Sequence, residues 1–327
     1  MAKKYVFLDA YEYPDSDFHQ EYEVFSKTGY QCEVGNCRTA DDVVKFAGDA
    51  EVIGDCYVPI TAELLDRLPE LRAVIRYGVG YDCVDVEACT KRKIMVCNLP
   101  HYCMEDVATH AMAMMLDLER KVTFLDRDCR KGNWNIALGY DSHRLSNLTL
   151  GLVGFGNIAR TLKKYAQVFR MRVIAYDPYL KEELFVKEQV KKVTLEELYR
   201  EADVLSLHLP ATPETQHLID KEALAAMKKS AMLINTSRGS IIDQQALLEA
   251  LKNKVIQAAA LDVFEKEPIR SANDVLYSCD NLIVTPHAAY NSVEASDEQH
   301  RTAAETAVVV LNGKIPENTV NQRQLGF

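Results

Sequence analysis

Short apolar runs alternate with amphipathic segments along the first hundred residues of the chain. The apolar runs predict five strands, at residues 5–10, 32–36, 51–55, 73–78 and 94–99. Four segments between them have helical spacing of apolar positions, at residues 18–29, 40–50, 61–70 and 85–93. Strand–helix alternation of this kind predicts a parallel sheet with helices on its faces.

A second alternation follows a long predicted helix at residues 106–120 and a polar region at residues 131–147. The long helix is apolar on more than one face, which predicts burial between domains. Six more strands are predicted at residues 149–154, 172–177, 203–209, 231–237, 256–264 and 281–287. Helices are predicted between them at residues 157–169, 195–202, 221–228 and 243–253, and a last helix at residues 292–311.

The composition fits two α/β domains and argues against a nucleic-acid-binding or membrane protein. The chain has 327 residues, too many for one ordinary core, and 48% of them are apolar. Its net charge is −10, with acids and bases interspersed, which argues against a nucleic-acid or anionic-membrane partner. No apolar run is long enough to predict a transmembrane helix, and the N-terminus is predicted to be a first strand rather than a signal peptide.

The nine cysteines include no C-x-x-C pair, and several lie inside apolar strand-like runs. A disulfide framework or a metal site is therefore not expected. Reduced thiols in a cytoplasmic protein are the simplest interpretation.

The segment 151-GLVGFGNIAR-160 follows a predicted strand and opens a predicted helix. Gly154, Gly156 and Ala159 fit the dinucleotide-binding pattern, in which small residues allow a tight turn, approach of a pyrophosphate and close packing. Alone, the pattern also fits an ordinary glycine-rich turn. Asp177 ends the next predicted strand, where a carboxylate accepts the ribose hydroxyls of NAD and repels the 2′-phosphate of NADP. NAD is the predicted cofactor.

Three charged residues follow later strands of the same predicted sheet. Arg238 ends 231-AMLINTS-237, Glu267 follows the strand that ends at Phe264, and His287 ends 281-NLIVTPH-287. Ligands of open parallel sheets bind at the carboxyl ends of the strands. Singly, the three could be a surface pair, a solvated turn residue and a core histidine. Together they supply an arginine fork for a carboxylate and an acid–base histidine with a carboxylate partner.

Several longer motifs, in order along the chain, resemble the D-isomer-specific 2-hydroxyacid dehydrogenases: RYGVGYDCVD, GLVGFGNIA, SLHLPATPETQHLI, LINTSRG, ALDVFEKEP, TPHAA and GKIPENTVN. The resemblance implies that Arg238 binds and polarises a 2-oxo acid. His287 would be the acid–base residue and Glu267 its partner, whereas Glu265 matches a variable position of the family. Val79 and Gly80 would offer N–H groups to the substrate carboxylate.

The resemblance also implies cofactor contacts that spacing alone does not predict. Asn157 and Ile158 would meet the pyrophosphate. Leu209, Pro210 and Thr215 would lie around the adenosine half and nearby phosphates. Thr236, Ser237 and Asp262 would face the nicotinamide.

The architecture implied is two doubly wound parallel-sheet domains. A flavodoxin-like substrate domain would comprise residues 1–101 and 291–327, and a Rossmann NAD domain residues 102–290. The substrate would bind in a cleft between them, and the protein would be a homodimer. The loop at residues 55–61 lacks the arginine and serine of phosphoglycerate-using relatives, so a small 2-oxo or 2-hydroxy acid is expected. A corepressor-like protein that binds NAD(H) without turnover is the alternative.

Overall fold

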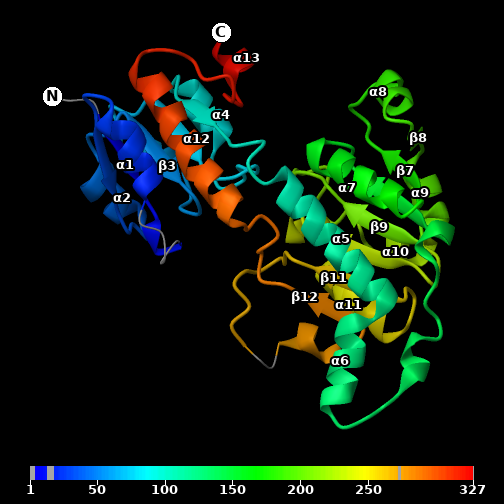
Figure 1. Cartoon of the computed structure of the whole chain (residues 1–327). Helices are drawn as coiled ribbons and strands as arrows, with labels where there is room; N and C mark the ends of the chain where they lie inside the picture. Colours follow the sequence, from blue (N-terminus) through cyan, green and yellow to red (C-terminus); the bar gives the residue numbers. More distant parts are fainter. Residues whose placement is uncertain (1–3, 13–17, 272–273, 327) are drawn as a thin grey trace. The chain divides into compact units, whose positions relative to one another are not determined.

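The computed structural model describes residues 4–12, 18–271 and 274–326. The chain divides into two compact units, Met1–Cys103 with Ser292–Phe327, and Met104–Asn291. Each unit contains one parallel sheet with helices on both faces (Figure 1), so the predicted fold class is confirmed. Within the described ranges, no helix combines the length and the apolar character needed to cross a membrane.

The sheet of the first unit has five parallel strands in the flavodoxin-like order β2-β1-β3-β4-β5. The strands are β1 (Lys4–Phe7), β2 (Gln31–Val34), β3 (Val52–Asp55), β4 (Ala73–Arg76) and β5 (Met95–Cys97). The central strands β1 and β3 are buried along their whole length, which explains their continuous apolar sequence.

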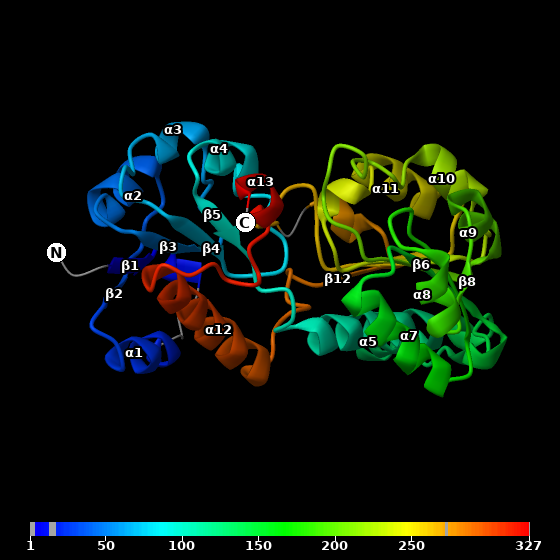
Figure 2. The same cartoon turned by 90° about the horizontal axis from the view of Figure 1, so that it is seen from above.

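Helices cover both faces of this first sheet (Figure 2). One face carries α1 (His19–Ser26) and α12 (Val293–Leu311), and the other carries α2 (Ala40–Ala47), α3 (Ala62–Leu65) and α4 (Val86–Lys91). Short pieces complete the unit: η1 (Ala10–Glu12) and α13 (Gln322–Leu325). Thr39 and Asp42 form a reciprocal capping box that explains why α2 begins where it does.

The sheet of the second unit has seven parallel strands in the order β12-β11-β10-β9-β6-β7-β8. Its strands are β6 (Thr149–Val153), β7 (Arg172–Tyr176), β8 (Lys191–Lys192), β9 (Val204–Leu207), β10 (Met232–Asn235), β11 (Ala258–Leu261) and β12 (Leu282–Val284). The order reverses direction at β6, so the glycine loop lies at the switch point between β6 and β9.

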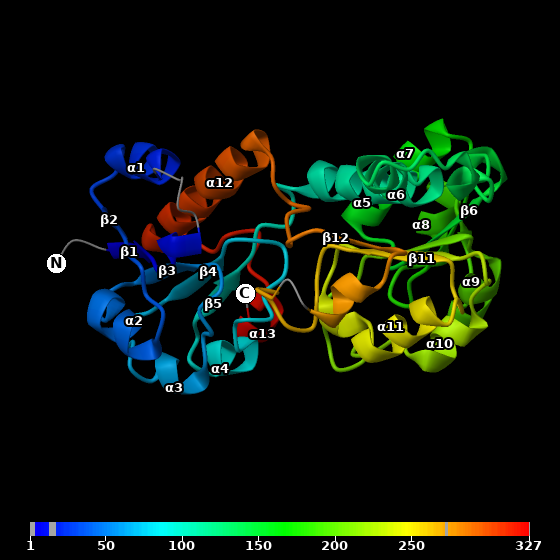
Figure 3. The same cartoon turned by 90° about the horizontal axis from the view of Figure 1, so that it is seen from below.

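Two helical layers cover the second sheet (Figure 3). One contains α5 (Met104–Arg120), α7 (Asn157–Val168) and α8 (Glu182–Lys187), and the other contains α9 (Leu195–Glu201), α10 (Lys221–Ala226) and α11 (Gln244–Lys252). Helix α5 packs against α7, β10 and β11, so its broad apolar surface covers the sheet of its own unit. Short 3-10 turns connect these elements: η2 (Ile136–Gly139), η3 (Leu145–Asn147), η4 (Gly239–Ile241) and η5 (Val275–Ser278).

Three elements of the second unit were not predicted from the pattern. Helix α6 (Val122–Arg130) follows α5 after Lys121, which adopts a left-handed φ of 56°, and buries none of its residues. The helix is amphipathic, with Phe124 packed against the core, but its nine residues are fewer than the roughly 11–18 over which a helical period is read. Helix α8 and the edge strand β8 are too short to give a periodic signal.

Candidate active site

The glycine loop joins β6 to α7 in the conformation that a dinucleotide site requires. Gly154 has a φ of +86°, and a Cβ there would lie 2.3 Å from the carbonyl oxygen of His208. A Cβ at Gly156 would meet open space, whereas Ala159 is fully buried against the sheet. Gly156 caps the twelve-residue α7, so Asn157 and Ile158 form the first turn, where N–H groups favour an anion. The loop therefore fits a pyrophosphate.

The Asp177 carboxylate is held beside this loop at the end of β7. One oxygen accepts the N–H of Phe155 at 3.0 Å, and the other accepts the N–H groups of Tyr179 and Leu180 at 3.0 and 3.2 Å. The side chain is half-buried. A carboxylate fixed in this way fits the ribose hydroxyls of NAD.

The end of β9 borders the other side of the glycine loop. The Thr215 hydroxyl donates to the Pro210 carbonyl at 2.8 Å and accepts from the Thr212 N–H at 2.8 Å, which closes the loop that also contains Leu209. His208 contacts the Ser206 hydroxyl at 2.9 Å, and burial lowers the pKa of its imidazole to about 4. His208 is therefore neutral near pH 7.

Arg238 follows β10 in a tightly held loop. The Ser237 hydroxyl donates to the Leu207 carbonyl at 2.5 Å, and the Asn235 amide donates to the Arg238 carbonyl at 2.8 Å. The Arg238 guanidinium donates to the Ser237 carbonyl at 2.8 Å. A Cβ on Gly239 would lie 1.9 Å from the main chain of Phe264, so glycine is required by the loop that carries Glu267.

The Thr236 hydroxyl is buried and has no hydrogen-bond partner among the described residues. A buried hydroxyl normally finds a partner, so this atom points to a bound group. The resemblance places the nicotinamide end of the cofactor at Thr236.

The structure brings Glu267 and His287 into direct contact. His287 Nδ1 lies 2.7 Å from Glu267 Oε2, and the other oxygen of Glu267 accepts the Phe264 N–H at 2.7 Å. The two side chains are 31% and 27% exposed, so a ligand can reach them. Glu265 has a different partner, His217, at 2.9 Å. Only one of the two neighbouring acids can therefore act on His287.

Asp262 lies beneath His287 and is fully buried. Its carboxylate accepts the Thr285 hydroxyl at 2.5 Å and the N–H groups of Ala288 and Ala289 at 2.9 Å each. Its carbonyl accepts the His287 N–H at 2.8 Å. These contacts show a carboxylate that braces the turn carrying His287. The resemblance implies that Asp262 also faces the nicotinamide, and this role stays a prediction.

His110 on α5 belongs to the same network, although sequence reasoning did not single it out. Its Nε2 lies 3.1 Å from the Thr285 hydroxyl and 3.8 Å from the Asp262 carboxylate. No motif signals this contact, because it joins residues 175 positions apart.

Val79 and Gly80 lie in the first unit, in the loop that follows β4. We call residues 77–80 the substrate loop. Its carbonyl groups are bound: Gly78 accepts the Leu99 N–H at 2.9 Å, and Val79 accepts the Asn98 amide at 2.7 Å. In the described part of the chain, the N–H groups of Val79 and Gly80 donate no hydrogen bond. They fit an incoming carboxylate.

Comparison with known proteins identifies the family. The family model described as D-isomer specific 2-hydroxyacid dehydrogenase, NAD binding domain, matches residues 112–289, more than half of the chain. The chain belongs to this family. The matched segment contains the glycine loop and the ends of β7, β9, β10, β11 and β12. This D-isomer specific 2-hydroxyacid dehydrogenase is an NAD-dependent oxidoreductase, as the sequence predicted.

Individual relatives agree with the family match. A glyoxylate reductase of Korarchaeum cryptofilum is 42% identical over 270 residues, which are 81% of this chain and 80% of that protein. The D-lactate dehydrogenase of Aquifex aeolicus, solved with NAD and lactic acid, is 30% identical with a TM-score of 0.85 over 96% of this chain and 98% of that one. An acyclic imino acid reductase, solved with NADPH and D-Arg, is 28% identical with a TM-score of 0.87 over 97% of this chain and 99% of that one.

Proposed function

We propose that this dehydrogenase reduces a small 2-oxo acid to the D-2-hydroxy acid with NADH, and catalyses the reverse reaction. The observation that carries the proposal is the 2.7 Å contact between His287 and Glu267 at the carboxyl edge of the sheet that holds the glycine loop. Acid–base residues need a fixed ring and a compensating charge, and Glu267 supplies both.

The roles of the residues follow from their chemistry. Bound NADH supplies a hydride to C2 of the oxo acid. Arg238 pairs with the substrate carboxylate and draws electron density toward the carbonyl oxygen. His287 uses Nδ1 for Glu267, which leaves Nε2 to donate a proton to that oxygen. One hydride and one proton complete the hydroxy acid, and neutral His287 accepts the proton in the reverse direction.

We assign the first unit to substrate binding. The N–H groups of Val79 and Gly80 would bind the carboxylate, as anions bind at other main-chain N–H clusters. Relatives named glyoxylate reductase favour a small oxo acid as substrate. The loop at residues 55–61 contains no lysine or arginine, so it offers no cation for a phosphorylated substrate.

A panel of 2-oxo acids tests the proposal. NADH oxidation would be followed at 340 nm with glyoxylate, hydroxypyruvate, pyruvate and phenylpyruvate. Turnover of at least one small member, and chiral analysis showing the D-hydroxy acid, is the expected result. Tight NADH binding without turnover of any member would contradict it and favour the corepressor-like alternative.

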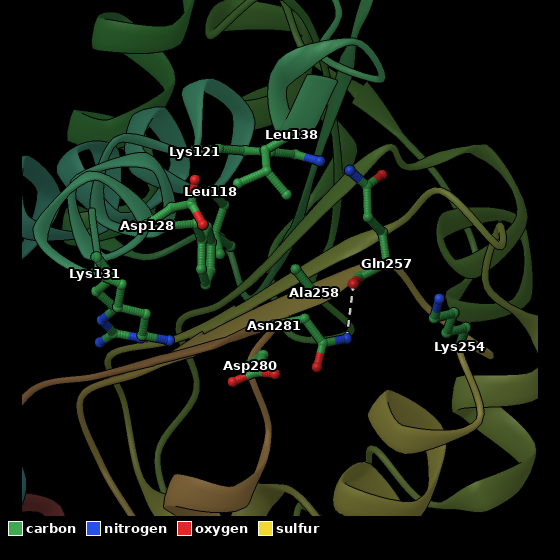
Figure 4. A pocket seen from close by; sticks show the side chains of 12 residues that line it. Leu118, Lys121, Asp128, Lys131, Leu138, Lys254, Gln257, Ala258, Asp280 and Asn281 are labelled. Atoms are coloured by element: carbon green, nitrogen blue, oxygen red, sulfur yellow. Dashed lines mark hydrogen bonds between the residues drawn. The ribbon is translucent and has the colours of Figure 1, made fainter. Parts of the chain in front are cut away.

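We further propose a homodimer formed through the second unit. The segment at residues 121–147, which we call the arm, carries exposed apolar side chains: Trp134 is 88%, Tyr140 75% and Ile136 68% exposed. Monomeric proteins seldom expose such side chains together. The arm lines a cavity of about 460 Å³, whose wall combines apolar side chains such as Leu118 and Leu138 with polar and charged ones such as Lys121 and Asp128 (Figure 4). Both features favour an interface with a second copy.

A further inference from the structure

The Arg76 side chain folds back against the substrate loop from the end of β4. Its Nη1 donates a hydrogen bond to the Tyr77 carbonyl, the first carbonyl of the loop. The same oxygen lies 3.2 Å from the Gln299 amide and 3.9 Å from the Cys56 thiol. With the bonds to Gly78 and Val79 described above, three successive carbonyls of the loop are held. Each carbonyl shares a rigid peptide unit with the N–H of the next residue, so the bonds to the Gly78 and Val79 carbonyls orient the N–H groups of Val79 and Gly80. Arg76 holds the peptide unit just before them, whose Gly78 N–H donates to the Arg76 carbonyl at 2.9 Å.

The neighbouring loop covers the Arg76 guanidinium. The Tyr57 ring lies over it, with 5.7 Å from the guanidinium carbon to the ring centroid. A cation over an aromatic face is attracted to it. The buried Asp9 carboxylate fixes Tyr57 by accepting its N–H at 2.6 Å and the Cys56 N–H at 3.0 Å. Arg76 thus connects the loops that follow β3 and β4.

Two buried acidic side chains lie in the electrostatic field of Arg76. Asp9 and Asp55 are both fully buried, and one oxygen of Asp55 has no hydrogen-bond partner among the described residues. Burial raises the pKa of Asp55, the charge of Asp9 raises it further, and the nearby Arg76 lowers it. The Arg76 guanidinium therefore offsets part of the effect of burial on the pKa of both acids.

We propose that Arg76 is a positioning residue for the 2-oxo acid, because it aligns the N–H groups of the substrate loop with the substrate carboxylate. The inference rests on the proposed function. The carboxylate interacts with the loop in the same way before and during hydride transfer. Loss of alignment therefore weakens ground-state and transition-state binding equally, which raises KM and leaves kcat nearly unchanged.

The test compares Arg76→Met and Arg76→Lys with Arg72→Met. Arg72 precedes the same strand and pairs with Glu51 at 2.8 Å, far from the loop, so it is a matched control. We expect Arg76→Met to raise the KM for the 2-oxo acid about tenfold or more, with kcat within about threefold of wild type. Arg76→Lys keeps the charge without the planar fork and should raise KM at least about threefold. Arg72→Met should match wild type.

Two binding measurements distinguish a failure of the Arg76 inference from a failure of the proposed function. The Kd for NADH should be unchanged in all variants, and the Kd for oxamate, an unreactive oxo-acid analogue, should follow KM. A wild-type KM in Arg76→Met, or in Arg76→Lys if the methionine variant does not fold, would overturn the inference. A loss of kcat and NADH binding together would also overturn it, since it would show general damage. A wild-type protein that neither reduces an oxo acid nor binds oxamate would remove the proposed function itself.

Discussion

Two histidine–glutamate pairs lie in the second unit, and their surroundings distinguish them. His287 meets Glu267 at 2.7 Å, and His217 meets Glu265 at 2.9 Å. Glu267 is fixed by the hydrogen bond that it accepts from the Phe264 N–H. His287 donates its main-chain N–H to the carbonyl of the buried Asp262. Glu265 instead accepts the Gln244 N–H at the start of α11. The first pair fits an acid–base role and the second fits a structural one.

Replacing each glutamate tests this distinction. Glu267→Gln keeps the side-chain size but removes the charge that compensates the imidazolium. We expect kcat for oxo-acid reduction to fall about 10- to 100-fold. Glu265→Gln is the matched control and should stay within about twofold of wild type. Steady-state kinetics would check both, and equal losses in the two variants would contradict the assignment.

His208 predicts a pH dependence of stability. Burial lowers its folded-state pKa from 6.5 to about 4, so the unfolded chain binds more protons between these values. Stability from this group is complete above about pH 6.5 and is lost as pH falls toward 4, by on the order of 2–3 kcal/mol. Urea unfolding of wild type and His208→Asn across this range would measure the difference. A gap that stays constant with pH would contradict the prediction, and exposed His101→Asn is the control.

At the scale of elements, the end of β7 sets the choice of cofactor. Asp177→Asn keeps one of the two oxygen acceptors for the main-chain N–H groups and removes the negative charge. We expect the ratio of kcat/KM for NADH to that for NADPH to fall about tenfold or more, because the repulsion of a 2′-phosphate is lost. Kinetics with both cofactors would measure it. An unchanged ratio, with an unchanged melting temperature, would show that Asp177 does not select NAD.

Strands were easier to predict than surface elements. The run at residues 149–154 became β6 and the run at 172–177 became β7, because buried parallel strands are apolar throughout. Helix α6 is amphipathic, but its nine residues are too few for a periodic pattern to be distinguished from the polar segment that follows it. The contact of His110 with Thr285, and the choice between Glu265 and Glu267, depend on how distant segments fold together. Periodicity contains no information about such contacts.

At the scale of the whole molecule, we expect the exposed apolar side chains of the arm to mediate self-association. Trp134→Ser with Ile136→Ser removes two exposed apolar side chains and should leave the folded monomer intact. We expect light scattering after gel filtration to show a dimer for wild type and a monomer, or a dimer with at least about tenfold weaker affinity, for the variant. Val186→Ser, an equally exposed position on α8, is the control. A wild-type monomer would contradict the proposal.

In the proposed reaction, His287 moves the proton during NADH-dependent reduction of a 2-oxo acid. The most direct measurement is kcat for reduction and for oxidation against pH, in wild type, His287→Asn and the control His217→Asn. A proton-transferring role for His287 predicts that wild-type reduction slows and oxidation accelerates as pH rises. It also predicts that His287→Asn loses about 100-fold or more in both directions, while His217→Asn keeps both profiles. Near-normal turnover in His287→Asn would contradict this role of His287.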